Sequence, residues 1–250
     1  MGQRVYDEKV TIDENKTRML YDERASRINR SDGISVNTSV LLGDQNPEYA
    51  DEWDKKEKEL ILPYLDITAS SSVIDIGCGV GRWAHTLMPL CRSYIGVDFS
   101  EGMINAASEY CKEYINEDRY FVVKAAQDFI VSHDKNQKAD CFIIAGVLMY
   151  INDSELPVMI EKIAESASEH CTLFITDTVA LDKRITLQEI YSQALKNNYS
   201  ALYRTVEEYD ELFGALETAG FECVSAGFFE KHNNEKEFSE TDRYYRILKR

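Results

Sequence analysis

The segment from Asp75 to Arg82 has the residue types and spacing of a loop that binds a nucleotide-like ligand. It reads Asp-Ile-Gly-Cys-Gly-Val-Gly-Arg. The glycines permit a tight turn and let a ligand approach the backbone, and a helix that begins here offers unpaired N–H groups. A dinucleotide loop has the spacing G-x-G-x-x-G, whereas the third glycine here falls one position earlier. The spacing therefore disfavours a nicotinamide cofactor, and an ordinary strand-to-helix turn is the alternative interpretation.

Two further segments follow the next two apolar runs of the chain. Asp98 comes directly after residues 94–97, and a carboxylate there can accept two hydrogen bonds from a ribose diol. Residues 126–129, Ala-Gln-Asp-Phe, follow the run 120–123, where a loop can hold an adenine ring. Taken singly, each could merely begin a helix. Together the three segments occupy the carboxyl ends of three successive strands, which indicates one ligand bound across them.

The elements that position these loops alternate between strand and helix. Ser100 is the expected N-cap of the helix that follows Asp98. Repeated alternation requires a parallel sheet with helices on both faces, so the predicted fold class is a doubly wound, Rossmann-like α/β sheet of seven mostly parallel strands. Its closing edge is expected to be antiparallel. Apolar patterning predicts strands at 73–76, 94–97, 120–123, 141–145, 172–175, 223–229 and 243–248, and helices at 81–90, 101–114 and 153–168.

Two regions fall outside this alternation. Residues 1–66 are expected to form a helical N-terminal extension, ahead of a main domain at 67–250. Residues 178–219 are expected to form a helical insertion in that domain. Open α/β sheets bind ligands at the carboxyl ends of their strands. We therefore expect both regions to form a lid over that edge.

Composition and charge disfavour several classes of function. The 250 residues carry 28 Lys and Arg against 44 Asp and Glu, a formal net charge of -16. Such a surface repels phosphate backbones, so neither nucleic acid nor an anionic membrane is an expected partner. The apolar runs are too short to span a bilayer and no signal peptide is evident, so a cytoplasmic location is expected. The six cysteines and four histidines lack metal-site spacing, and no metal is predicted.

Residues 73–176 resemble a class I S-adenosylmethionine-dependent methyltransferase. Residues 73–81 (Val-Ile-Asp-Ile-Gly-Cys-Gly-Val-Gly) are similar to the first motif of that family, and 96–100 (Gly-Val-Asp-Phe-Ser) to its second. Residues 145–153 are similar to the segment after its fourth strand. Arg82 and residues 126–129 resemble, more narrowly, the protein N-terminal methyltransferases. The resemblance implies S-adenosylmethionine as cofactor and methyl transfer as activity.

The resemblance also implies where the cofactor lies. The backbone at 77–79 would pass its methionine moiety, Asp75 would lie close to the ammonium, and Arg82 would pair with the carboxylate. Asp98 would bind the ribose hydroxyls, and Gln127 would lie by the adenine. The residues expected to bind the cofactor are Asp75, Gly77, Cys78, Gly79, Arg82, Asp98, Phe99, Ser100, Met103, Ala126, Gln127, Asp128 and Gly146.

The methyl acceptor is less well specified. Residues 199–205 and 240–245 are similar to segments of methyltransferases encoded with sugar-modifying and surface-polysaccharide enzymes, although packing of the sheet edge is an equal alternative for 199–205. A hydroxyl acceptor would need a base, for which Asp177 is the first candidate and Tyr150 the second. We expect a small-molecule acceptor with a hydroxyl or an amine, with a sugar or surface-glycan precursor as one candidate. A peptide or protein α-amine, or a non-catalytic module that binds an adenosyl ligand, are the alternatives. The predicted substrate-binding residues are Tyr21, Tyr150, Tyr199, Tyr203 and Arg204.

Overall fold

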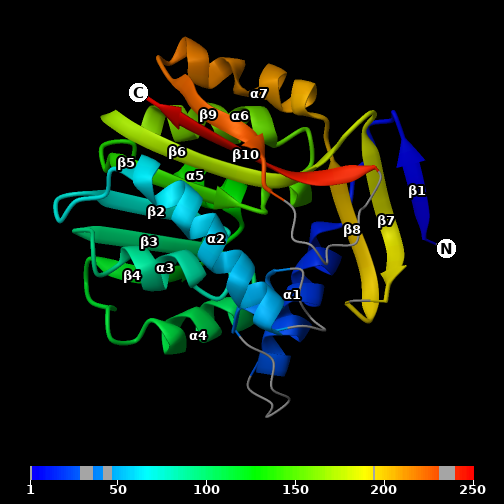
Figure 1. Ribbon diagram of the computed structural model, residues 1–250, viewed down its shortest axis with the longest axis horizontal. Coiled ribbons are helices and arrows are strands. Elements are labelled where there is room, and N and C mark those ends of the chain that lie inside the picture. The colour runs from blue at the N-terminus through cyan, green and yellow to red at the C-terminus, as the bar shows by residue number, and fades with distance from the viewer. Residues whose placement is uncertain (1, 29–35, 42–46, 194, 231–239) are drawn as a thin grey trace.

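A seven-stranded sheet forms the centre of the molecule (Figure 1). The computed structural model describes residues 2–28, 36–41, 47–193, 195–230 and 240–250. The strand order is β4-β3-β2-β5-β6-β10-β9, with parallel pairing from β4 to β6 and antiparallel pairing of β10 with β6 and β9. The predicted Rossmann-like sheet with an antiparallel edge is confirmed. Its strands are β2 (Ser72–Ile76), β3 (Ser93–Asp98), β4 (Arg119–Val123), β5 (Ala139–Ala145), β6 (Ala167–Ala180), β9 (Glu222–Phe228) and β10 (Thr241–Lys249).

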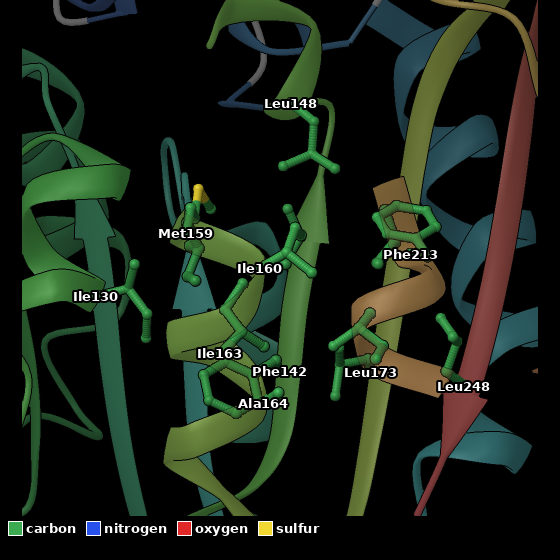
Figure 2. Close-up of a cluster of buried hydrophobic side chains, with 14 of the residues drawn as sticks. Ile130, Phe142, Leu148, Met159, Ile160, Ile163, Ala164, Leu173, Phe213 and Leu248 are labelled. Atoms are coloured by element: carbon green, nitrogen blue, oxygen red, sulfur yellow. The ribbon is translucent and has the colours of Figure 1, made fainter. Parts of the chain in front are cut away.

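Helices cover both faces of this sheet, which explains why its parallel strands are nearly continuous apolar runs. On one face, Ile74 and Ile76 belong to a core cluster with residues of α5, α6 and α7, and Figure 2 shows part of that cluster. On the other face, Val73 packs in a cluster with residues of α2 and α3. The helices are α2 (Pro47–Leu65), α3 (Arg82–Leu87), α4 (Glu101–Tyr110), α5 (Ala126–Ser132), α6 (Leu156–Ser166) and α7 (Val206–Thr218), with a 3₁₀ turn η2 (Leu148–Tyr150).

The sheet order places the candidate loops together. The chain runs outward from β2 through β3 to β4 and then returns to place β5 on the other side of β2. The loops that follow β2 and β5 therefore diverge in opposite directions. Such a switch point at the carboxyl ends of parallel strands is where open α/β sheets bind ligands.

The inserted region is a β-hairpin for much of its length. β7 (Ile185–Ser192) and β8 (Asn197–Tyr203) pair antiparallel, and β1 (Gln3–Tyr6) adds a third strand beside β7. The expected helical insertion was wrong for 185–192 and 197–203, and among the described residues of the insertion only the stretch that forms α7 is helical. The register shifts between Leu187 and Ile190, where Glu189 has a φ of 55°. This irregularity interrupts the alternation of apolar and polar residues by which a strand is identified.

The N-terminal extension is only partly helical, because β1 is a strand. α1 (Glu14–Ile28) lies between the two sheets and packs against α4 and β8 (Figure 1). A 3₁₀ turn η1 (Val36–Ser39) follows, held by Arg24, which donates from Nε to the Ser39 carbonyl at 2.6 Å and from Nη2 to the Thr38 carbonyl at 3.0 Å. The extension thus crosses the carboxyl ends of the parallel strands.

Three general features of the described residues concern membrane crossing, metal binding and thiols. None of the helices within the described ranges combines the length and the apolar character that crossing a membrane requires. No group of three His, Cys, Asp or Glu side chains in that part of the chain is arranged to hold a metal ion. All six cysteines are free thiols, and only Cys223 is exposed.

Candidate functional site

The glycine loop after β2 is a tight left-handed turn. Gly77, Gly79 and Gly81 have φ values of 73°, 53° and 80°, which residues with a Cβ rarely adopt. The N–H groups of Gly77 and Cys78 both donate to the Val97 carbonyl, at 2.7 and 2.9 Å. These bonds bend the loop toward the end of β3. The loop predicted from the glycine spacing is therefore confirmed as a turn at the strand ends.

Asp98 fixes this loop to the start of α4. Its Oδ2 accepts from the Gly79 N–H at 3.0 Å, and its Oδ1 accepts from the Ser100 N–H at 2.9 Å. Ser100 caps α4 as predicted, accepting from the Met103 N–H at 3.1 Å. Burial raises the pKa of the Asp98 carboxyl to about 6, although its backbone hydrogen bonds act in the opposite direction. Asp98 is thus an organised acceptor at the end of β3.

Asp75 lies beneath the loop, and its side chain is fully buried. The Tyr94 hydroxyl donates to its Oδ2 at 2.5 Å. Burial raises the pKa of the Asp75 carboxyl to about 7, while the bond from Tyr94 and the charge of Arg82 lower it. A carboxyl that titrates near neutrality next to a ligand loop is typical of functional sites.

Arg82 is held in a buried group of charges between α2 and α3. Its guanidinium pairs with Asp54 at 3.0 Å and with Glu57, whose side chain is fully buried. Lys58 donates from Nζ to Asp54 Oδ2 at 2.6 Å and to the Arg82 carbonyl at 2.8 Å. Arg82 therefore pairs with carboxylates of α2, and its pairing with the cofactor carboxylate stays a prediction.

The segment after β4 meets the start of α1. The Gln127 amide donates from Nε2 to Glu14 Oε2 at 2.9 Å and to Glu155 Oε1 at 3.1 Å. Burial and the neighbouring Glu155 raise the pKa of Glu14 to about 7. Asn152 donates to Glu14 Oε1 at 3.0 Å and accepts from the Ile12 N–H at 2.9 Å. Glu14 and Asn152, which sequence reasoning missed, thus tie the N-terminal segment to this loop.

The remaining predicted cofactor residues differ in exposure. Phe99 is partly buried and lies near Tyr21, with ring centroids 6.1 Å apart, and Met103 is fully buried. Ala126 is partly buried, whereas Asp128 is exposed. At Gly146, which has a φ of 73°, no atom lies within 4 Å of the position that a Cβ would take. The end of β5 therefore has open space at the level of the glycine loop.

Four tyrosines from three elements meet at the end of β5. The Tyr21 hydroxyl donates to Tyr150 at 2.8 Å, Tyr150 and Tyr199 share a bond of 3.0 Å, and Tyr203 donates to Tyr199 at 3.3 Å. Burial raises the pKa of Tyr150 and Tyr199 well above 10 and that of Tyr203 to about 12, so these phenols are neutral. The structure thus brings together the four tyrosines predicted to bind substrate. We call them the tyrosine cluster.

Asp177 and Arg204 lie apart from these hydroxyls and contact other groups. Asp177 is buried and accepts from the Tyr209 hydroxyl of α7 at 3.2 Å, and burial raises its pKa to about 7. Arg204 donates to the carbonyls of Leu148 and Ile151, each at 2.8 Å, which bracket Tyr150 in the chain. Arg204 therefore positions the turn that carries Tyr150, rather than joining the tyrosine cluster itself.

Arg204 is further fixed by a carboxylate that sequence reasoning missed. Its Nε donates to Asp153 Oδ1 at 2.8 Å, and Arg184 donates to Asp153 Oδ2 at 2.6 Å. Opposite charges hold the pKa of Asp153 below its usual value against the effect of burial. No spacing rule joins residues 153, 184 and 204, so the pairing becomes visible only in the fold.

The residues present fit a nucleoside with a charged amino-acid tail. Asp98 ends β3 where a diol can reach a carboxylate, and the open space at Gly146 adjoins the glycine loop. The amide of Gln127 lies one strand further out, at the end of β4. The tyrosine cluster lies on the β5 side. The donors and acceptors of these residues thus match those of a nucleoside, and the tyrosine cluster lies beside them.

The central part of the chain is similar to a known protein family. Residues 73–169 match the family described as a methyltransferase domain. Phosphoethanolamine N-methyltransferase 1 of Triticum aestivum is 22% identical over 191 residues, which cover 74% of this chain and 37% of that protein. The chain spans between 22% and 37% of the length of three such curated relatives.

Solved structures share the fold at low identity. Phosphoethanolamine N-methyltransferase 1 of Haemonchus contortus, in complex with phosphoethanolamine and S-adenosylhomocysteine, superimposes with a TM-score of 0.69 at 16% identity, covering 95% of this chain and 50% of that one. Magnesium protoporphyrin IX methyltransferase of Synechocystis PCC 6803, with bound S-adenosylmethionine, gives 0.61 at 16% identity and covers 97% and 99%. These structures confirm the fold that the resemblance in the sequence implied.

Proposed function

We propose that this chain, whose residues 73–169 form a class I S-adenosylmethionine-dependent methyltransferase domain, methylates an amine nitrogen of a small molecule. The observation that carries the proposal is the tyrosine cluster, four phenols joined by hydrogen bonds at the end of β5, with raised pKa values at Tyr150, Tyr199 and Tyr203. Several relatives are named phosphoethanolamine N-methyltransferases, which supports an amine acceptor.

The charge state of the cluster favours an amine over a hydroxyl. A hydroxyl acceptor must lose its proton near the moment of attack, which needs a base. The cluster offers phenols whose pKa values are raised, so they are poor bases. Neutral phenol oxygens accept hydrogen bonds from an ammonium, and tyrosine rings attract cations. An amine can be bound in this way and needs only to be neutral when it attacks.

The cofactor side of the proposal follows the predicted residues. Asp98 binds the ribose hydroxyls, Gln127 lies at the adenine, and the loop at 77–79 holds the methionine part, with Asp75 near its ammonium. When bound, S-adenosylmethionine supplies a methyl group that is already activated on a sulfonium. The protein therefore contributes chiefly alignment and the exclusion of water. α1 performs that exclusion, because it carries Tyr21 and covers the carboxyl ends of the strands.

The tyrosine cluster orients the acceptor for an in-line displacement. Hydroxyl oxygens of Tyr21, Tyr150 and Tyr199 accept from the acceptor's N–H groups and direct its lone pair toward the methyl carbon. The acceptor gives its ammonium proton to water before the attack. Methyl transfer would exchange the C–S bond of the sulfonium for a C–N bond to the acceptor, with the sulfur leaving as a neutral thioether. Asp177 takes no part, since its carboxyl bonds to Tyr209 of α7.

A panel of acceptors with one variant tests the proposal. The wild type should methylate amines, assayed as phosphoethanolamine, ethanolamine and a short peptide, and not sugars that lack an amine. Tyr150→Phe should lower kcat/KM for the amine about two- to tenfold, because a neutral hydrogen bond contributes about 0.5–1.5 kcal/mol. Affinity for S-adenosylhomocysteine should not change.

The control is Tyr191→Phe, which removes a hydroxyl from a tyrosine that is 56% exposed on β7. It should behave as wild type. Turnover of hydroxyl acceptors alone would contradict the amine proposal. Unchanged kinetics in Tyr150→Phe would show that the tyrosine cluster does not bind the acceptor.

A further inference from the structure

Gln127 is held by two carboxylates that belong to separate parts of the chain. Glu14 begins α1, whereas Glu155 directly precedes α6. Both accept from the same Gln127 nitrogen, Nε2, at 2.9 and 3.1 Å. Gln127 and Glu14 are 113 residues apart in the chain, so only the fold brings them together.

This contact fixes which atom of the amide is left for a ligand. A glutamine amide carries two N–H donors on nitrogen and acceptor lone pairs on oxygen. Both donors of Gln127 are used by the two carboxylates. A flipped amide would place its oxygen against oxygens of both glutamates, at most one of which carries a proton to donate, so the amide is satisfied at both glutamates only with its nitrogen toward them. Gln127 therefore presents only its carbonyl oxygen to a partner.

The position of Gln127 indicates what that partner is. It lies at the start of α5, directly after β4, and β4 is the neighbour of β3, which ends at Asp98. A nucleoside whose ribose bonds to Asp98 directs its base toward this loop. The exocyclic 6-amino group of adenine is a donor that suits a carbonyl oxygen. The 6-oxo group of hypoxanthine is an acceptor, and it would leave that oxygen unpaired.

The N-terminal segment is well placed to maintain this arrangement. Asn152 donates to Glu14 Oε1 at 3.0 Å and to the Ile12 carbonyl at 3.2 Å, and accepts from the Ile12 N–H at 2.9 Å. Glu14 is therefore held at both of its oxygens, by Asn152 and by Gln127. A carboxylate whose two oxygens both accept hydrogen bonds has a fixed position, and it therefore fixes the orientation of the amide beside it.

We propose that Glu14 and Glu155 are positioning residues that lock the Gln127 amide and thereby set selectivity for an adenine over a hypoxanthine base. The inference rests on the cofactor placement proposed above. It extends that placement by giving the N-terminal segment a role in the selection of the cofactor. Neither glutamate contacts the reacting atoms.

Calorimetry with two nucleosides tests the inference on the full chain. S-adenosylhomocysteine and S-inosylhomocysteine differ only in the base, where a 6-amino donor beside an N1 acceptor is replaced by a 6-oxo acceptor beside an N1–H donor. The wild type should bind the adenosyl compound about five- to 150-fold more tightly, because a buried polar group left unpaired costs about 1–3 kcal/mol. Glu14→Ala should reduce this ratio severalfold, and Glu14→Ala with Glu155→Ala should reduce it close to one. Glu14→Gln retains an acceptor oxygen and should restore most of the ratio.

The matched control is Glu23→Ala, which removes a carboxylate from the same helix, where it accepts from Asn197 at 2.6 Å. It should keep the wild-type ratio. A wild type that binds neither compound would contradict the cofactor placement itself. A wild type that binds both equally, or a double variant that keeps the full ratio, would overturn the positioning role and leave the cofactor placement intact.

Discussion

Replacing Asp98 with Asn separates the role of this residue in binding from its role in folding. The substitution keeps the shape and one acceptor oxygen but removes the charge. A hydrogen bond to a charged acceptor contributes about 1.5–3 kcal/mol. Loss of one ribose bond should therefore weaken binding of S-adenosylhomocysteine about tenfold, and loss of both at least about a hundredfold.

The same substitution should alter the pH dependence of stability. Burial raises the pKa of Asp98 from 3.8 to about 6 in the folded protein. A carboxyl whose folded pKa is raised favours folding at low pH, and this contribution is lost as the pH rises through about 6. A shift of roughly two pKa units corresponds to about 3 kcal/mol. Relative to wild type, Asp98→Asn should therefore gain up to about 3 kcal/mol of unfolding free energy between pH 4 and pH 8.

Calorimetry and denaturant unfolding at pH 4 and pH 8 measure the two effects independently. Asp118→Asn, an exposed acid that directly precedes β4, is the control and should change neither. The Asn at 98 also leaves the Gly79 or the Ser100 N–H facing a donor, a constant cost of about 1–3 kcal/mol at both pH values. Unchanged affinity in a folded Asp98→Asn variant would refute the assignment of Asp98 to the cofactor site.

Two further predictions concern Arg82 and the N-terminal extension. Arg82→Met should lower the unfolding free energy by about 3–5 kcal/mol, because it removes the ion-pair partner of the buried Glu57 and leaves Asp54 with Lys58 alone; chemical denaturation at pH 7 measures this, and a variant of wild-type stability would contradict it. A chain that begins at Glu48 should still bind S-adenosylhomocysteine, since Asp75, Asp98 and Gln127 remain, but should lose methyl transfer at least about a hundredfold without α1. Normal turnover of an amine by that shortened chain would show that α1 is no lid.

The cofactor half of the fold could be predicted because its signals are local. Each parallel strand contains a short apolar run, and the glycine loop and Asp98 follow such runs directly. Ser100 was predicted as an N-cap from its place before a helical pattern, and it accepts from the Met103 N–H. In these segments, residues close in sequence determine the backbone geometry.

The acceptor half could be predicted only in part, because its contacts are distant in sequence. The irregularity at Glu189 interrupts the alternating pattern of a strand. The sequence was therefore interpreted as a helix where β7 and β8 are strands. The tyrosines were identified by residue type, but nothing in the spacing joins Tyr21 to Tyr150, 129 residues later. Arg204 was expected at the substrate, yet its donors bind carbonyls and Asp153. A sequence shows that an arginine is present, but not which acceptors surround it.

The strands of the three-stranded sheet β1-β7-β8 are expected to pair at different stages of folding. β7 and β8 are joined by a short connection and pair locally, whereas Gln3 of β1 faces Gln188, 185 residues away. The entropy of closing so long a loop makes β1 the costly strand to add. It is therefore expected to join late in folding and to detach first when the protein opens. Tyr199 and Tyr203 lie on β8, which is separated from β1 by β7, so β1 can detach without displacing these tyrosines or the seven-stranded sheet.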